Sequence, residues 1–133
     1  MDKSLVQLTA SEVVEGLKKG EISPLELISA AETRILETEP AINALPTLCF
    51  ERARAHAKAL MEKEQHGFEN SRGWLAGLPV AIKDLTDVAG VRTTYGSSIF
   101  KDHIPKTSHP LVKRIENMGC LLYTSDAADD SYR

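Results

Sequence analysis

The sequence is poor in cysteine and has no long apolar run. Its two cysteines, Cys49 and Cys120, are too few for a disulfide framework or a cysteine-based metal site. No apolar stretch approaches the roughly 18 residues that cross a bilayer, and no charged-then-apolar leader pattern opens the chain. These absences favour a reducing, cytoplasmic location, and we interpret Cys49 as a small buried apolar side chain.

An excess of basic charge is also missing. The 16 Lys and Arg residues are outnumbered by 19 Asp and Glu, the formal net charge is -3, and the basic residues form no stripe along the sequence. Since nucleic acids attract clustered positive charge, we expect no direct nucleic-acid partner, and we expect no membrane partner either. His56 and His66 lack metal-ligand spacing, and His103 and His109 lie in a proline-containing segment with no cluster of carboxylates or thiols nearby in the sequence, so no metal and no cofactor is expected.

Helix signals fill the first half of the chain, whose hydrophobic and charged content is that of an ordinary globular protein. The run Thr-Ala-Ser-Glu at 9–12 is a capping-box pattern that predicts a short helix. The run Ser-Pro-Leu-Glu at 23–26 repeats it with proline at the first helical position, and predicts a longer helix that ends before Pro40. An extended piece at 43–50 and a third, largely solvent-facing helix at 51–65 are expected next.

Glycine punctuates the sequence from Gly67 onward, which indicates strands and tight turns. The apolar run at 78–82 predicts a strand that begins near Pro79, because proline cannot donate to a sheet ladder. A further helix is predicted from about Ser108 to Gly119. This order indicates an α/β layer architecture, yet one or two strands make no stable sheet, so the chain reads as part of a larger core.

The last 14 residues break with the pattern before them. Residues 120–133 follow the helix stop and soon become polar and acidic, and the first ten resemble the translation of a transposase adapter used in sequencing libraries. We therefore predict that residues 1–119 are the N-terminal portion of a domain, and that residues 120–133 are an adapter or read-through tail outside the fold. The alternative is a genuine disordered acidic tail.

The run at 77–84, Gly-Leu-Pro-Val-Ala-Ile-Lys-Asp, places Lys83 at the end of the expected strand. Apolar surroundings favour the neutral form of a lysine, which can act as a general base and activate a serine hydroxyl. The simpler interpretations are a solvated lysine or an ion pair with Asp84. Adjacent residues of an extended segment point to opposite faces, which argues against the ion pair.

Residues 73–97, Gly-Trp-Leu-Ala-Gly-Leu-Pro-Val-Ala-Ile-Lys-Asp-Leu-Thr-Asp-Val-Ala-Gly-Val-Arg-Thr-Thr-Tyr-Gly-Ser, resemble the lysine-bearing block of the amidase signature family. Flanking segments at 20–27 and 102–119 are also similar. The resemblance implies an α/β fold with a mixed sheet covered by helices, of which this chain is the N-terminal part. It implies hydrolysis of carboxamide C–N bonds, with Lys83 as the base. In that family the base acts on a serine held by a cis peptide bond, which relays the proton from a nucleophilic serine.

The two serine-bearing blocks of that family are absent here. Ser97 and Ser98 follow Gly96 in a loop, but neither sits in a glycine-rich nucleophile setting, and Ser98 stands where many relatives have proline. Thr93, Thr94 and Gly96 are expected to shape the loop, with Gly96 supplying a backbone angle that other residues avoid.

Lys83 is therefore the one catalytic residue that the sequence indicates, and the chain alone is expected to be inactive. The resemblance implies a small-molecule amide as the substrate of the full-length protein. Two alternatives stay open: an amide-transferring subunit that amidates misacylated tRNA, and a short non-catalytic binding or interaction module. The sequence does not indicate the oligomeric state.

Overall fold

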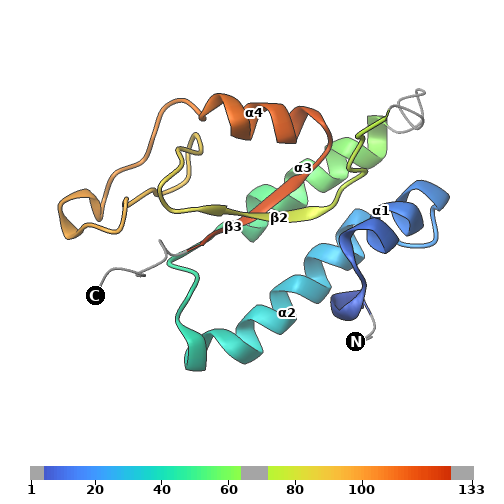
Figure 1. Cartoon of the computed structure of the whole chain (residues 1–133), viewed down its shortest axis with the longest axis horizontal. Helices are drawn as coiled ribbons and strands as arrows, with labels where there is room; N and C mark the ends of the chain where they lie inside the picture. The colour runs from blue at the N-terminus through green and yellow to red at the C-terminus, as the bar shows by residue number, and fades with distance from the viewer. Residues whose placement is uncertain (1–4, 64–71, 127–133) are drawn as a thin grey trace.

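The computed structural model describes residues 5–63 and 72–126 (Figure 1). Two α-helices precede the first strand, and strands and α-helices alternate after them. The elements in chain order are η1 (Leu5–Gln7), α1 (Ala10–Lys19), α2 (Pro24–Ile42), β1 (Thr47–Leu48), α3 (Phe50–Lys63), β2 (Pro79–Lys83), η3 (Ser98–Phe100), α4 (Pro110–Asn117) and β3 (Leu121–Asp126). Within these described ranges, no helix is both long and apolar enough to span a membrane.

The three strands form one mixed sheet in the order β1-β3-β2. β3 pairs antiparallel with β1 and parallel with β2, with a register shift between Val80 and Ala81. Leu121 and Leu122 lie next to each other on β3 and face opposite sides of the sheet. Leu121 packs with residues of α2 and α3, and Leu122 with Val112 of α4. Helices thus cover both faces, which confirms the predicted fold class.

Both predicted capping boxes are present. The Thr9 and Ser23 side chains accept hydrogen bonds from the backbone N–H groups of Glu12 and Glu26, whose carboxylates bond back to the caps. The prediction that the second helix ends before Pro40 is wrong, since α2 continues to Ile42. Pro40 lies in the last turn, where it removes a single intrahelical hydrogen bond.

The third helix is largely solvent-facing, as predicted, and one of its faces is buried. Phe50, Ala53 and Ala57 of α3 are buried and pack with Ile28 of α2. Alanine suits this face because it is both a strong helix former and small enough to allow close packing.

The second half of the chain follows the predicted order with small shifts. β2 begins at Pro79, as predicted. α4 begins at Pro110 rather than near Ser108, and His109 is its N-cap, accepting a hydrogen bond from the N–H of Leu111. The Ser108 hydroxyl instead accepts a hydrogen bond from the N–H of Ala89 at 2.9 Å.

The structure differs from the prediction that residues 120–133 lie outside the fold. Residues 121–126 form β3, the central strand, and Cys120, Leu121 and Leu122 are at most 3% exposed. The segment begins with apolar residues that suit a buried strand, and the acidic residues that guided the prediction come later. Residues 127–133 lie outside the described residues. The adapter resemblance concerns the origin of the segment and stays a prediction.

Candidate active site around Lys83

Lys83 is the last residue of β2, as predicted, and its side chain is exposed. Its carbonyl oxygen accepts a hydrogen bond from the N–H of Thr86 at 2.9 Å, so a tight turn ends the strand immediately after the lysine. The described residues do not enclose the ammonium group among apolar neighbours. The backbone of Lys83 is therefore fixed by a hydrogen bond, while its side chain is accessible at this end of the sheet.

Asp84 points away from Lys83 and is only 2% exposed. Its carboxylate accepts two hydrogen bonds from Thr94, one from the backbone N–H at 2.7 Å and a short one from the hydroxyl. Its carbonyl oxygen accepts a hydrogen bond from the N–H of Tyr95 at 2.9 Å. Lys83 and Asp84 thus face opposite sides, in agreement with the argument against an ion pair between them.

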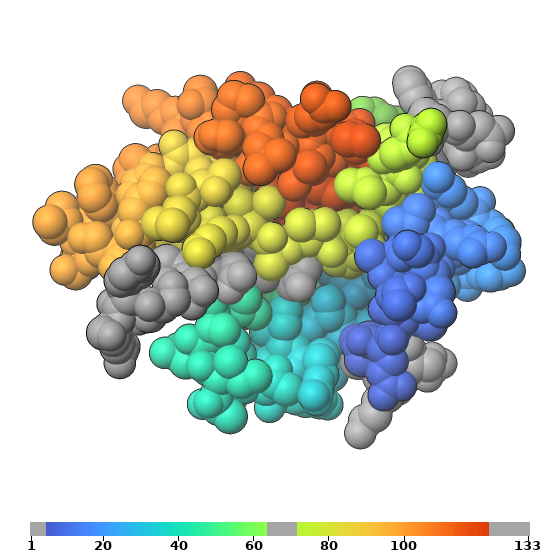
Figure 2. Space-filling model, viewed as in Figure 1, coloured from blue at the N-terminus to red at the C-terminus, as the bar shows by residue number. Residues whose placement is uncertain are grey.

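The loop after β2 is held by several backbone bonds. The N–H of Thr93 donates to the carbonyl of His103 at 3.0 Å, and the N–H of Gly90 donates to that of Pro105 at 3.0 Å. Gly96 has a φ of 68°, the left-handed conformation expected for it. In Figure 2, the yellow and orange residues of this region form a lobe on the side of the molecule away from α1.

Tyr95 and its neighbours form a polar cluster that the sequence did not reveal. The Tyr95 hydroxyl makes a short hydrogen bond to a carboxylate oxygen of Asp87 and lies 3.4 Å from His103 Nε2. The bond to Asp87 is the main reason that the pKa of Tyr95 is raised, so the phenol keeps its proton. No sequence signal marks this cluster, because its members are separated by turns whose course depends on the whole loop.

The loop serines have ordinary local roles. The Ser97 hydroxyl accepts a hydrogen bond from the N–H of Ile99 at 3.3 Å and caps η3, while Ser98 is exposed. Within the described ranges, neither serine hydroxyl is hydrogen-bonded to a basic side chain. This agrees with the expectation that they cap a turn or are solvated.

The two thiols are poor nucleophiles. Burial raises the pKa of Cys49 and raises the pKa of Cys120 to about 12, so the reactive thiolate is disfavoured at both positions. Cys49, which was expected to be buried, is half-buried, and its thiol donates to the carbonyl of Leu122 at 3.6 Å. In the part of the chain that is described, no three His, Cys, Asp or Glu side chains gather in a metal-binding group.

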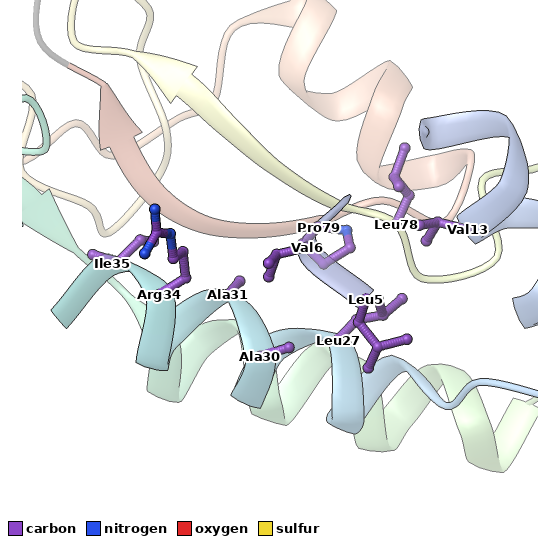
Figure 3. Close-up of a pocket in the computed structure, with 10 residues that line it drawn as sticks. All are labelled: Leu5, Val6, Val13, Leu27, Ala30, Ala31, Arg34, Ile35, Leu78 and Pro79. Atoms are coloured by element: carbon purple, nitrogen blue, oxygen red, sulfur yellow. The ribbon is translucent and has the colours of Figure 1, made fainter. Parts of the chain in front are cut away.

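A hollow of about 310 Å³ lies at the other end of β2 (Figure 3). Arg34 of α2 contributes the charged side chain of its lining, and the rest is apolar, including Val6 of η1, Ala31 of α2 and Pro79 at the start of β2. Pro79 and Lys83 are four positions apart on the strand, a distance of roughly 13 Å. The hollow is therefore separate from the candidate site and offers no acid–base pair for acyl transfer.

The chain matches the protein family described as Amidase over residues 26–130. A glutamyl-tRNA(Gln) amidotransferase subunit from Carboxydothermus hydrogenoformans is 38% identical over 117 residues, which cover 88% of this chain and 24% of that protein. The corresponding mitochondrial protein of Ornithorhynchus anatinus is 32% identical over 126 residues, covering 95% of this chain and 24% of that protein.

Solved structures agree with the family match. A bacterial aryl acylamidase of the amidase signature enzymes is similar with a TM-score of 0.78 and 27% identity, covering 90% of this chain and 25% of that one. A fatty acid amide hydrolase shares the fold with a TM-score of 0.80 at 19% identity, covering 92% of this chain and 21% of that one. The chain spans about a quarter of the length of the relatives it matches. On the family match and the shared fold together, the chain belongs to the amidase signature family.

Proposed function

We propose that this chain is the N-terminal portion of an amidase that hydrolyses carboxamide C–N bonds in the cytoplasm, with Lys83 as its general base. The observation that carries the proposal is the placement of Lys83: it ends β2, its side chain is exposed, and the backbone on both sides is held by hydrogen bonds. The substrate is a small-molecule amide, and the reaction needs neither a metal nor a cofactor.

Lys83 supplies the base, and two serines from the rest of the protein supply the relay and the nucleophile. The Lys83 amine takes a proton from the relay serine, which takes one from the nucleophilic serine as that oxygen attacks the amide carbonyl. The proton returns to the leaving amine, and water then releases the acid from the acyl-serine. The exposed side of Lys83 leaves room for these groups. The chain alone, without them, is expected to show no amidase activity above background.

The test begins with the source DNA, read across codon 119 from an adapter-free amplification. We expect a reading frame that continues into a glycine- and serine-rich block, and we refer to its product as the longer polypeptide. In this protein, Lys83→Ala should lower kcat/KM toward a simple aryl amide by about 10² to 10⁴. Lys58→Ala, which removes an exposed lysine of α3, is the matched control and should have no effect. A confirmed stop codon after the present tail, or full activity in Lys83→Ala, would overturn the proposal.

The curated relatives favour a second candidate. The two glutamyl-tRNA(Gln) amidotransferase proteins described above are 38% and 32% identical to this chain. A protein of that kind would transfer an amide nitrogen to glutamate on misacylated tRNA instead of releasing it to water. The two candidates separate in one assay of the longer polypeptide: hydrolysis of an aryl amide without partners supports the hydrolase, whereas amide transfer that requires partner proteins and tRNA supports the transferase.

The binding-module alternative is testable on residues 1–133, which include the central strand β3. A genuine short module should unfold cooperatively, whereas a piece of a larger core should aggregate or stay partly unfolded. Ile99, Ile104 and Leu111 are 85%, 58% and 56% exposed. We expect aggregation, and a clean two-state thermal melt of residues 1–133 would support the module instead.

A further inference from the structure

The carboxylate next to Lys83 is buried almost completely. Asp84 is 2% exposed, and it is among the largest side chains that are fully buried in the described structure. Transfer of a carboxylate from water into a protein interior is costly unless hydrogen bonds satisfy its oxygens. An aspartate at the end of a strand could face solvent at no such cost, so its burial requires an explanation.

Thr94 satisfies both carboxylate oxygens. Its backbone N–H donates to Oδ1 of Asp84 at 2.7 Å, and its hydroxyl makes a short bond to Oδ2. The threonine is itself only 8% exposed, and its hydroxyl oxygen accepts a hydrogen bond from the N–H of Gly96 at 3.3 Å. Together with the bond from Tyr95 N–H to the carbonyl of Asp84, these contacts close the loop from 84 to 95 on itself.

This closure fixes the direction of Lys83. The two residues are joined by one peptide bond, which is planar, so the orientation of Asp84 and that of the lysine carbonyl are linked. With Asp84 held in the interior, the side chain of its extended neighbour must leave from the opposite face. The turn bond from Thr86 N–H to the carbonyl of Lys83 holds the same peptide from the other side.

We propose that Asp84 is a positioning residue for Lys83, and that it acts through the hydroxyl and amide of Thr94. The inference rests on the proposed function of Lys83 as a base. Asp84 does not touch the substrate. It sets where the lysine amine sits relative to the relay serine, and a displacement of about 1 Å at such a group can lower the rate by about 100-fold.

The chain contains a matched pair of threonines for the test. Thr94→Val removes the hydroxyl that bonds Asp84 and keeps the shape of the side chain. Thr93→Val removes a hydroxyl from a residue that is also buried, at 2% exposure, in the same loop, but that hydroxyl donates to the carbonyl of Val91 at 3.2 Å. Any general cost of losing a buried hydroxyl in this loop therefore appears in both variants, and the loss of positioning appears only in Thr94→Val.

The experiment measures kcat and KM of the longer polypeptide, normalised to titrated active sites. Thr94→Val should lower kcat by about 10- to 100-fold and leave KM within about two-fold, whereas Thr94→Ser should restore kcat to within about three-fold. Asp84→Asn, which cannot accept both Thr94 bonds, should behave as Thr94→Val does. Thr93→Val should keep the wild-type kcat per active site.

The outcomes separate the two proposals. If Lys83→Ala abolishes activity while Thr94→Val keeps the wild-type kcat, or if Thr93→Val is equally impaired, the positioning role is refuted and the base assignment stands. If Lys83→Ala retains wild-type activity, the proposed function fails and the positioning role fails with it. A lowered kcat in Thr94→Val that serine rescues, with Lys83→Ala inactive, supports both.

Discussion

The helical region, residues 5–63, and the turn-rich region, residues 72–120, are held by different kinds of contacts. Each helical capping box joins residues three positions apart, at Thr9–Glu12 and Ser23–Glu26. The turn-rich region depends on distant partners: the N–H of Leu75 donates to the carbonyl of Met118, and that of Gly77 to Gly119, each at 2.7 Å. Short-range contacts can form in an isolated segment, whereas the second kind requires the whole region to be in place.

The largest effect should come from a glycine at which two distant segments meet. Gly77 has a φ of 99°, and a Cβ there would lie 2.7 Å from Cγ of Pro24. Gly77→Ala adds this clash to the strain of a left-handed alanine, and should destabilise the longer polypeptide by about 3 kcal/mol in pulse proteolysis. Gly90→Ala, at φ 74° with open space, should cost about 1 kcal/mol. If Gly77→Ala and Gly90→Ala lowered the stability equally, the close approach of Gly77 to Pro24 of α2 would be unimportant.

The next effect concerns an ion pair between the two regions. Arg52 of α3 and Glu116 of α4 form an ion pair at 2.6 Å, with 23% and 18% of their side chains exposed. Glu116→Ala leaves a largely buried guanidinium, whose Nη1 already has no hydrogen-bond partner among the described residues, and should cost about 2 kcal/mol in the same assay. The double variant Arg52→Met/Glu116→Leu should recover most of that loss. If the double variant instead lost at least as much stability as Glu116→Ala, the unpaired guanidinium would not be the cause of the loss.

A smaller effect should test the local character of the helical region. A peptide of residues 21–44 contains all of α2, and its circular dichroism should show partial helix, whereas a peptide of residues 72–97 should show none. Ser23→Ala removes the cap and should weaken the first peptide by about 1 kcal/mol of helix stability. Thr33→Ala serves as control, since its hydroxyl bonds only the carbonyl of Ser29 within the helix. If both peptides formed helix, the difference between short-range contacts in the helical region and long-range contacts in the turn-rich region would not hold.

The smallest effect should be a pH dependence at the boundary between the regions. Burial, and then the nearby Arg52, lower the pKa of His56 below its usual 6.5, against the opposing influence of Glu116. The unfolded chain therefore binds a proton at a higher pH than the folded one, and the free energy of unfolding should fall as the pH drops below about 6.5. His56→Gln should flatten this part of the curve measured by pulse proteolysis. An unchanged slope would show that other groups cause it.

The contrast between the regions also explains what the sequence predicted. The capping boxes, the start of β2 at Pro79 and the placement of Lys83 at its end follow from short motifs, and all three are present. The bonds of Asp84 to Thr94 could not be predicted, because they join residues across a ten-residue loop whose course no local pattern defines. The sequence prediction ended the fold at residue 119 because of the acidic composition that follows, whereas the structure places residues 121–126 in the central strand.

The strand order has a consequence for synthesis of the protein. β3 is the last described strand in the chain, yet it lies between β1 and β2, so neither of the earlier strands has its described sheet partner until β3 has been made. Roughly forty residues separate the end of β2 from the end of β3, which corresponds to about 2 to 9 s of translation. Until β3 has paired with it, β2 carries Ile82 without the cover that Leu122 of β3 and Val112 of α4 give it, so a chain that stops short of β3 presents an uncovered apolar strand.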